Sequence, residues 1–456
     1  ERLSSRSIIS DRLPPRGACV NFTSPKRTVP PTDETGPMKI TAAKGTRDIL
    51  PGEVEVWQRV EQSAHRLFSL YGVREIRTPI FESTELFARS TGSDTDIVTK
   101  EMYTFADRSD RSITLRPEGT PGVVRAAIEN SLLRRGEIDR FYYIGPMFRY
   151  ERPQKGRYRQ FSQIGVEVFG SAHPAIDAEV MEMAISLFAS LGIEGARLQL
   201  NSVGHPECRS VYRQALKNAL EPHRAELCAD CQRRLDANPL RIFDCKVPRC
   251  GEIRATAPVI VDYLCAGCRA HLAGVRECLE MLGVAYDLNP RLVRGLDYYT
   301  RTTFEVVSDK LGAQNALCGG GRYDDLVASM GGPPTPGFGF AIGADRLVMV
   351  VADLHRFSAP ADIYIVHLGD AALKEALGAS RALRGFGLAV RLDPDSKEVK
   401  KQMARASAWG ARYALIIGER EMERGAYALK NLAAGTQQDV AARGWDEIRR
   451  EVENAG

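Results

Sequence analysis

The amino-acid sequence predicts an α+β fold in which helices pack on an antiparallel sheet, an inserted domain interrupts the sheet, and a small α/β domain follows. Three observations predict it. Two strand-like segments, 140–151 and 160–170, flank a short polar loop. Eight of the ten cysteines lie between Cys208 and Cys278, and strand-like and helical patterns alternate after residue 360. Such changes of pattern along one chain are typical of separate structural modules.

The overall composition limits the function. The 456 residues are 44% hydrophobic and 26% charged, an ordinary globular composition with room for two or three domains. The net charge of +4 is too small for a general attraction to nucleic acid, so any anion site must be local. No apolar run reaches the roughly 18 residues that a membrane span needs. Ten cysteines are too few for a disulfide scaffold, so we expect a reducing, cytoplasmic setting without a membrane partner.

Residues 1–37 differ from the rest of the chain and are expected to form a disordered extension. Ser, Arg and Pro recur there without apolar periodicity, and the only acidic residues before residue 33 are Glu1 and Asp11. One interpretation is an organelle transit peptide, which is rich in Arg and Ser and poor in acids. We favour the other, an upstream extension or a mis-set start, because Met38 directly precedes the first segment with ordered patterning.

The segments 140–151 and 160–170 predict an antiparallel hairpin, because Pro and Gly in the connecting loop interrupt both patterns. Successive side chains of a strand point to opposite faces. In the second strand, the face predicted to enter the core carries Ile164, Val166 and Val168. The other face presents Gln163 and Glu167 on either side of Gly165, a shape suited to a small polar ligand.

The hairpin loop is strongly basic. Between residues 148 and 161, FRYERPQKGRYRQF, a single acid, Glu151, accompanies five cations: Arg149, Arg152, Lys155, Arg157 and Arg159. Because guanidinium groups fork onto phosphate oxygens, this pattern predicts a polyphosphate ligand. Neither a P-loop nor a G-x-G-x-x-G motif is present, so the nucleotide is expected to bind on the sheet. Taken singly, Arg149 or Glu167 would more often be a solvated or ion-paired strand residue.

Three further stretches favour the same kind of site. TLRPEGTPG, residues 114–122, holds Glu118 and Thr120 in a loop bounded by Pro and Gly. LVRGLDYYTRTTFEV places Arg294 beside a glycine at the predicted start of a strand, where a ligand can approach the backbone. GFGFAIGADRLVMV, residues 337–350, predicts a strand whose glycines leave a flat surface for a base. The helix that follows holds Arg346 in its first turn, where its N-terminus attracts phosphate.

The cysteine-rich segment contains the pairs Cys228-x-x-Cys231 and Cys265-x-x-Cys268, with two more cysteines, Cys245 and Cys250, between them. Paired motifs of this kind are typical of structural zinc, with four thiolates around one tetrahedral ion. The gap between the pairs is long, however, and free cysteines are common small core residues. We therefore assign no metal ligands from the sequence and keep structural zinc (Zn2+) as the alternative.

Residues 361–456 predict a small α/β domain. The strand-like runs IYIVHL, GLAVRL and RYALIIG alternate with helical patterns at 370–385 and 397–410. This βαβαβ arrangement is typical of a small parallel or mixed sheet.

These motifs resemble those of class II aminoacyl-tRNA synthetases, and closely those of the histidyl-tRNA synthetase family, from about Lys44 to the C-terminus. GTRDILP and the helix ending in YGVREIRTPIFE are similar to the dimer-forming first motif, FRYERPQKGRYRQF to the second and GFGFAIGADRL to the third. LVRGLDYYTRTTFE and GGGRYDDL are similar to the histidine-specific signatures.

The resemblance implies a six-stranded antiparallel catalytic sheet and a division of the chain into five parts. These are a disordered extension (1–37), the first part of a catalytic domain (38–205), a cysteine-rich insertion domain (206–275), the second part of the catalytic domain (276–358) and an anticodon-binding domain (361–456).

The resemblance also implies how ATP would be held. Arg149 and Arg294 would bind the α-phosphate from opposite sides and serve as the catalytic residues. Arg157 and Arg346 would bind the outer phosphates. Pyrophosphate would leave together with magnesium (Mg2+).

For the amino acid, the resemblance implies two sets of contacts. Glu118, Thr120 and Gln163 would bind the α-amino and carboxylate groups of histidine. Glu167, Tyr299 and Tyr323 would line the imidazole pocket.

The implied activity is ATP-dependent ligation of L-histidine to tRNA(His) through a histidyl-adenylate, by a homodimer. The alternative is a catalytically inactive paralogue that acts as a regulatory subunit of histidine biosynthesis or as a tRNA sensor. Such proteins tend to lose motif arginines or the anticodon domain, whereas this sequence keeps both. We favour the enzyme.

Overall fold

The computed structural model describes residues 40–92, 95–154, 156–308, 316–354 and 361–454. The expected N-terminal extension, 1–37, lies outside the described residues. The chain divides into a unit of residues 1–42 and a unit of residues 43–456, and every element below belongs to the second unit. Within the described part, no helix is long and apolar enough to cross a bilayer.

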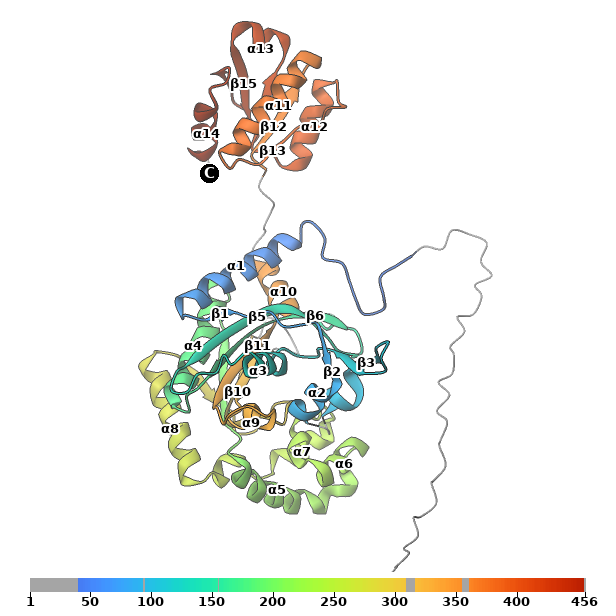
Figure 1. Ribbon diagram of the computed structural model, residues 1–456, viewed down its shortest axis with the longest axis vertical. Helices are drawn as coiled ribbons and strands as arrows, with labels where there is room; N and C mark the ends of the chain where they lie inside the picture. Colours follow the sequence, from blue (N-terminus) through green and yellow to red (C-terminus); the bar gives the residue numbers. More distant parts are fainter. Residues whose placement is uncertain (1–39, 93–94, 155, 309–315, 355–360, 455–456) are drawn as a thin grey trace, which may run out of the picture. The chain divides into compact units, whose positions relative to one another are not determined.

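An eight-stranded sheet is the largest element of the fold (Figure 1). The strand order is β1-β5-β6-β11-β10-β9-β7-β8. The six middle strands are antiparallel, which confirms the prediction, whereas the short edge strands β1 and β8 run parallel to their neighbours. The bounds are β1 (Arg74–Glu75), β5 (Asp139–Phe148), β6 (Gln160–Phe169), β7 (Arg197–Ser202), β8 (Tyr286–Leu288), β9 (Thr300–Val307), β10 (Ala316–Arg322) and β11 (Gly337–Gly343). β5 and β6 form the predicted hairpin.

Helices cover one face of this sheet: α1 (Val54–Leu70), α4 (Pro174–Ser190) and α10 (Ala344–Leu354). The apolar side chains of β6 predicted for the core, Ile164, Val166 and Val168, are buried in their cluster. α4 is buried on most of its surface, because it packs against the sheet, α1 and α8 (Ala266–Met281). Its sequence is therefore apolar nearly all round, as expected for a helix without a solvent face.

The second face of the sheet is also covered. α3 (Thr120–Glu129) lies on β6 and is flanked by α2 (Thr84–Thr91) and α9 (Leu326–Ser329). A small sheet adjoins these helices, with the order β2 (Phe81–Ser83), β4 (Ser112–Leu115), β3 (Tyr103–Ala106), and a π-helical turn, Ile97–Glu101, precedes β3. Val123 and Val124 of α3 share an apolar cluster with Phe169 of β6. The polar residues on this face are therefore enclosed.

A helical segment joins β7 to β8. It contains α5 (Pro206–Leu220), α6 (Ala229–Ala237), α7 (Pro248–Ala255) and α8, with 3-10 turns at Glu221–Glu226, Pro239–Asp244 and Ile260–Tyr263. His205, Cys228 and Cys265 occupy the N-cap positions of α5, α6 and α8. The interpretation that the two Cys-x-x-Cys pairs share one ion is wrong, because the pairs lie in two separate clusters.

Residues 361–454 form a five-stranded sheet of order β13-β12-β14-β15-β16. The predicted βαβαβ unit is confirmed: β12 (Ile363–His367), α11 (Asp370–Gly385), β13 (Val390–Arg391), α12 (Val399–Trp409) and β14 (Tyr413–Ile417), with the three strands parallel. The sequence pattern did not indicate the elements after them: α13 (Glu419–Arg424), β15 (Ala426–Asn431), β16 (Gln437–Ala441) and α14 (Trp445–Asn454). The sequence of β16 shows no hydrophobic alternation, because Val440 is the one buried residue of this edge strand.

Candidate active site

Glu167 of β6 is the most deeply buried acid of the predicted site, with 1% exposure. Its Oε1 accepts a hydrogen bond of 2.6 Å from the hydroxyl of Thr120, the first residue of α3. Its Oε2 accepts one from the hydroxyl of Tyr323, which directly follows β10. Two hydroxyl donors from different elements therefore fix both oxygens of this carboxyl group.

Glycines of β11 make room for these side chains. An added Cβ at Gly339 would lie 2.1 Å from Oε2 of Glu167, and one at Gly337 would lie 2.3 Å from the ring of Tyr323. The prediction that these glycines leave a flat surface for a base is therefore wrong at Gly337 and Gly339, because the side chains of Tyr323 and Glu167 already fill the space. At Gly343, the end of the strand, no described residue other than its two chain neighbours has an atom within 4 Å of such a Cβ.

Glu118 is the second buried acid, with 3% exposure, and lies two residues before α3. It accepts hydrogen bonds of 3.0 Å each from the hydroxyls of Thr91 and Tyr298. The ring of Tyr298 lies 4.8 Å from that of Tyr299 and 5.8 Å from that of Tyr323, measured between centroids. The structure thus brings both acids and three tyrosines into one enclosed, aromatic-lined site.

Burial strongly affects the charge of both acids. Burial raises the pKa of Glu167 to about 8, although the hydrogen bonds from Thr120 and Tyr323 oppose the rise. Burial also raises the pKa of Glu118, and the positive charge of Arg149 partly offsets this effect. Because desolvation disfavours the ionised form, Glu167 is mostly protonated at neutral pH in the free protein.

Replacing Glu167 with glutamine is expected to stabilise the free protein increasingly as pH rises. The folded protein keeps this proton up to about pH 8, whereas the unfolded chain releases it near pH 4.5. Wild-type stability therefore falls across this window, and the variant avoids the fall. Chemical denaturation at pH 5, 6.5 and 8 should show a difference that grows to a few kcal/mol, at about 1.4 kcal/mol per pH unit at most. A difference independent of pH would contradict the assignment.

Gln163, on the same strand, offers an amide to this site. It is 8% exposed, and among the described residues its Oε1 has no hydrogen-bond partner, as expected for a group that meets a polar ligand. The space for a small polar ligand that the sequence predicted above Gly165 is already filled. An added Cβ there would lie 2.3 Å from the ring of Tyr143, which comes from the neighbouring strand, and the same ring lies 2.2 Å from an added Cβ at Gly119.

Arg149 follows β5 and borders the acidic site. Its Nε donates a 2.8 Å hydrogen bond to the carbonyl oxygen of Pro117, and its guanidinium carbon lies 5.3 Å from the centroid of the Phe161 ring. Burial raises the pKa of Glu118, and the charge of Arg149 opposes this rise. The hydrogen bond to Pro117 and the contact with the Phe161 ring therefore orient the guanidinium of Arg149 beside the two buried acids.

Arg157 and Arg346 form a second cationic position. Arg157 lies in the hairpin loop and pairs with Glu151 at 2.9 Å. Arg346, in the first turn of α10, donates to the carbonyl oxygens of Gly156 at 3.4 Å and Ala316 at 3.2 Å. Burial, together with the nearby charge of Arg157, lowers the pKa of Arg346. Two cations that repel each other in this way favour the binding of an anion between them.

Arg294 lies in the loop before β9, six residues ahead of Thr300, and the prediction that it starts the strand is wrong. Its Nη1 donates to Oε1 of Glu305 at 2.5 Å. An added Cβ at Gly319 of β10 would lie 2.0 Å from Nη2 of Arg294. Burial raises the pKa of Tyr299, and the charge of Arg294 opposes this rise. Arg294 therefore lies over a glycine of the sheet and close to the tyrosines of the acidic site.

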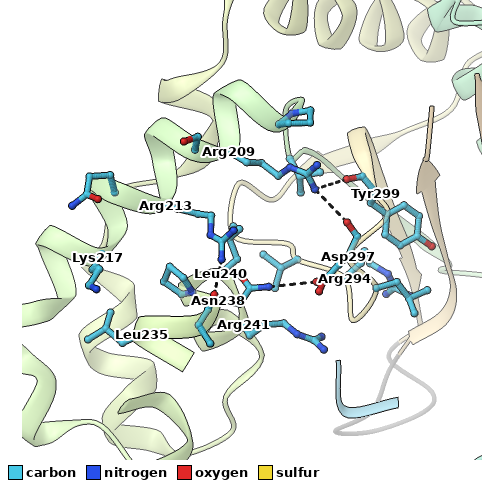
Figure 2. Close-up of a pocket in the computed structure, with 18 of the residues that line it drawn as sticks. Arg209, Arg213, Lys217, Leu235, Asn238, Leu240, Arg241, Arg294, Asp297 and Tyr299 are labelled. Atoms are coloured by element: carbon cyan, nitrogen blue, oxygen red, sulfur yellow. Dashed lines mark hydrogen bonds between the residues drawn. The ribbon is translucent and has the colours of Figure 1, made fainter. Parts of the chain in front are cut away.

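A pocket of about 670 Å³ opens between the helical insertion and the segment that carries Arg294 (Figure 2). Two predicted site residues, Arg294 and Tyr299, line it. Its charged lining is mostly basic, with Arg209, Arg213, Lys217, Arg241 and Arg294 against Asp236 and Asp297. Arg209 of α5 donates to the carbonyl oxygen of Tyr299 at 2.8 Å, so the insertion directly holds the backbone of the tyrosine segment. The pocket suits an anionic ligand.

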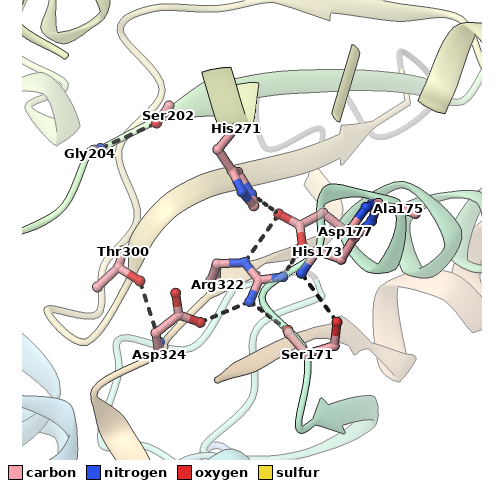
Figure 3. Close-up of polar contacts among 10 residues, drawn as sticks. All are labelled: Ser171, His173, Ala175, Asp177, Ser202, Gly204, His271, Thr300, Arg322 and Asp324. Carbon is pink, nitrogen blue, oxygen red and sulfur yellow. Dashed lines mark hydrogen bonds and ion pairs between the residues drawn. The ribbon is translucent and has the colours of Figure 1, made fainter. Parts of the chain in front are cut away.

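A buried ionic network fixes the other end of the site (Figure 3). The guanidinium of Arg322, which is fully buried, pairs with both oxygens of Asp177 on α4 and with Asp324 at 2.9 Å. His271 of α8 lies 2.9 Å from Oδ2 of Asp177. Burial alone raises the pKa of Asp177, but the bond to His271 and the charge of Arg322 lower it overall. Because Arg322 directly precedes Tyr323, this network positions the tyrosine that bonds Glu167.

Four residues at or beside the site were missed in the sequence: Thr91, Tyr143, Arg209 and Tyr298. Tyr298 had a signal, because it adjoins Tyr299 in the quoted signature. Tyr143 could have been found from the register of β5 against β6, which places it opposite Gly165. Thr91 and Arg209 lie outside every motif, and only the tertiary fold brings them here.

A six-stranded antiparallel core, a long hairpin with a basic loop, a strand–helix junction with an arginine, and a separate α/β domain define a class II aminoacyl-tRNA synthetase. Residues 45–242 and 254–347 match the family model described as histidyl-tRNA synthetase, and residues 362–448 match the model described as an anticodon binding domain. The chain belongs to the histidyl-tRNA synthetase family, as its motifs predicted.

Individual relatives agree with this assignment. The chain is 51% identical to the histidine–tRNA ligase of Geobacter metallireducens over 401 aligned residues. These residues make up 88% of this chain and 97% of that protein. It is 52% identical over 410 residues to the histidine–tRNA ligase of Solibacter usitatus, with 89% and 98% covered. The crystal structure of apo histidyl-tRNA synthetase from S. aureus is similar with a TM-score of 0.75 and 38% identity, over 91% of this chain and 99% of that one.

Proposed function

We propose that this chain is a histidine–tRNA ligase, which joins L-histidine to tRNA(His) at the expense of ATP through a histidyl-adenylate. The observation that carries this function is similarity over nearly the whole chain to histidine–tRNA ligases, at about half identity. The motif residues that an inactive paralogue tends to lose, Glu118, Arg149, Arg294 and Arg346, are all present, and so is the C-terminal domain.

In the proposed histidine site, Glu118, Thr120 and Gln163 bind the α-amino and carboxylate groups. The buried Glu118 supplies a negative charge for the ammonium group. The amide oxygen of Gln163, which has no hydrogen-bond partner in the part of the chain that the structure describes, supplies a second acceptor. We add Tyr298 to this set as a positioning residue, because its hydroxyl holds one oxygen of Glu118.

Glu167, Tyr299 and Tyr323 line the proposed imidazole pocket. Thr120 and Tyr323 orient the Glu167 carboxyl group, so its remaining acceptor capacity has a fixed direction for a ring N–H. A side chain without such a donor would leave this buried carboxyl group without its ligand contact. This supports discrimination in favour of histidine.

In the proposed ATP site, Arg149 and Arg294 bind the α-phosphate, and Arg157 and Arg346 bind the outer phosphates. The repulsion between Arg157 and Arg346 supports this arrangement, because a triphosphate between them would relieve it. ATP enters as its magnesium (Mg2+) complex, in which the metal belongs to the substrate. The basic pocket beside Arg294 leaves room for further anionic groups.

Both chemical steps then follow from positioning. A carboxylate oxygen of histidine attacks the α-phosphorus in line, and the bond to pyrophosphate breaks. A terminal ribose hydroxyl of the tRNA then attacks the histidyl carbonyl carbon, loses its proton, and displaces AMP. Neither step uses a protein nucleophile, so the chain contributes orientation and the stabilisation of negative charge at the α-phosphate.

The remaining assignments concern partners and domain roles. We propose that the domains divide as the sequence suggests, with residues 361–456 reading the anticodon. We also propose a homodimer through the first motif. Large apolar side chains in and beside that motif are exposed, Leu50 by 62%, Leu70 by 76% and Phe81 by 55%, and such residues are often covered by a partner. Because the reaction needs tRNA, the protein works where translation occurs, which we take to be the cytoplasm.

Exchange of pyrophosphate into ATP, measured with each amino acid in turn, tests the specificity. We expect histidine alone to support exchange, because leucine or phenylalanine has no ring N–H to donate to the remaining acceptor capacity of the buried Glu167 carboxyl group. Exchange with another amino acid and none with histidine would contradict the specificity, and no exchange with any amino acid would favour the inactive paralogue.

A further inference from the structure

Two groups of metal-ligating side chains lie in the helical segment, away from the proposed active site. The four-cysteine cluster consists of Cys228, Cys231, Cys245 and Cys250. The histidine–cysteine cluster consists of His205, Cys208, Cys265 and Cys268. In each group, one ligand atom from every residue lies within 4.8 Å of the ligand atoms of the other three. Neither group takes part in the proposed aminoacylation chemistry.

The four-cysteine cluster has the dimensions of a metal site. Sulfurs placed about 2.3 Å from a zinc ion form a tetrahedron with edges of about 3.8 Å. The Sγ atoms of Cys228 and Cys245 lie 3.8 Å apart. The amide of Cys228 also donates to Sγ of Cys250 at 3.3 Å, and the amide of Val247 donates to Sγ of Cys245 at 3.4 Å. Amide donors of this kind stabilise thiolates that bind a metal.

The histidine–cysteine cluster repeats this arrangement with one nitrogen. Nε2 of His205 lies 3.8 Å from Sγ of Cys265, and the amide of Cys265 donates to Sγ of Cys208 at 3.2 Å. When Nε2 binds a metal, Nδ1 carries the ring proton. The long hydrogen bond of 3.4 Å from the Cys208 amide to Nδ1 is then lost, because a protonated Nδ1 cannot accept it. The carboxylate of the exposed Glu207 lies 3.3 Å from the same Nε2 and remains free to turn to solvent.

Neither disulfide bonding nor simple core packing accounts for these two clusters. A disulfide joins two sulfurs at about 2.05 Å, and the cysteines of both clusters are free thiols. Cysteines that merely fill a core have no reason to converge four at a time, and Cys265 is exposed. Convergence of four thiolates, or of three thiolates and one imidazole, is typical of structural zinc.

We propose that the segment between β7 and β8 is a two-zinc module, with one ion in the four-cysteine cluster and one in the histidine–cysteine cluster. This reverses the preference for free core cysteines, which was based on the long gap between the two Cys-x-x-Cys pairs. Spacing failed because neighbouring pairs along the chain belong to different ions. With four protein ligands each, both ions are structural and leave no open position for substrate.

The two ions would hold different parts of the segment. The histidine–cysteine cluster joins the start of α5 to the start of α8, so it would fasten the point where the chain leaves the sheet after β7 to the start of the helix that leads back to β8. The four-cysteine cluster joins α6, the residue after the 3-10 turn Pro239–Asp244, and α7. That turn carries Leu240 and Arg241 into the wall of the basic pocket. Zinc would therefore fix this wall opposite Arg294.

The test is the metal content of the full-length chain, purified without chelators from zinc-supplemented cells. We expect two zinc ions per chain by mass spectrometry. Cys245→Ser and Cys268→Ser should each retain one ion, and Cys278→Ser, a cysteine of α8 outside both clusters, should retain two. Cobalt exchanged into the protein should show tetrahedral ligand-field and thiolate charge-transfer bands, and Cys245→Ser should remove about half of the intensity.

A ligand swap keeps the test decisive if a serine variant fails to fold. His205→Cys replaces a nitrogen ligand with a thiolate and should keep two zinc ions, whereas His205→Ala should lose one. Less than half a zinc per chain in the wild type would overturn the proposal, and so would equal loss from Cys278→Ser and Cys268→Ser. Iron with inorganic sulfide in place of zinc would overturn the choice of metal, and a single ion would overturn the two-site arrangement.

Discussion

Replacing Arg294 with alanine is expected to lower the rate of histidyl-adenylate formation by roughly 10² to 10³-fold, the scale for removing one preorganised donor to a charged transition state. The guanidinium is assigned to the α-phosphate, where negative charge builds during attack, so the affinity for histidine should change much less. Single-turnover measurement of adenylate formation gives the rate, and its dependence on histidine concentration gives the affinity.

Two further variants test whether the rate depends on the position of the Arg294 guanidinium or only on the total positive charge of the pocket. Gly319→Ala keeps Arg294 but places a methyl carbon only 2.0 Å from the present position of Nη2. The guanidinium must therefore move, and the rate should also fall. Arg213→Ala removes another cation of the same pocket, one that donates to the carbonyl oxygen of Ala237, and should leave the rate nearly unchanged. If Arg294→Ala and Arg213→Ala reduced the rate equally, a general effect of pocket charge would replace the proposed α-phosphate contact.

Ending the chain at residue 360 is expected to abolish most charging of tRNA(His) while pyrophosphate exchange with histidine largely survives. The truncation removes the five-stranded sheet of residues 361–454 but no residue of the proposed histidine or ATP sites. Charging needs the tRNA to be held, whereas exchange needs only the small substrates. Initial rates of both reactions on the same preparation measure the difference.

Thermal melting of the truncated chain comes first, because a loss of fold would reduce both reactions together. A folded truncation that charges tRNA as efficiently as the full chain would show that residues 361–456 are not the tRNA reader. A folded truncation that loses exchange as well would show that these residues support the catalytic part in some further way.

The sequence was sufficient to predict the helices and strands whose hydrophobic periodicity is strong. The structure confirms the β5–β6 hairpin and the apolar face with Ile164 and Val166. It also confirms the first five helices and strands of the C-terminal domain. The edge strands β8 and β16 were missed, since strands of three to five residues with little burial carry no readable period. The interpretation of residues 71–82 as the end of a helix is wrong, because α1 ends at Leu70 and β1 lies in this stretch.

The site was predictable as a set of residues but less so as a shape. Alternation along β6 placed Gln163 and Glu167 on one face, yet it could not show that Tyr143 fills the space over Gly165 from the next strand. The glycines of the strand 337–343 were interpreted as room for a base, whereas Gly337 and Gly339 make room for the protein's own Tyr323 and Glu167. What occupies the space above a glycine depends on cross-strand register, which local sequence does not determine.

The buried pair of Asp177 and Arg322 has a consequence for how the chain is made. The two residues are separated by 145 positions, and the whole helical insertion is translated between them. At roughly 5–20 residues per second, Asp177 is synthesised some 7 to 30 seconds before its guanidinium partner. A carboxylate buried without a partner is strongly destabilising. The ion pair that neutralises Asp177 can therefore form only after β10 has emerged, and the whole insertion emerges before it.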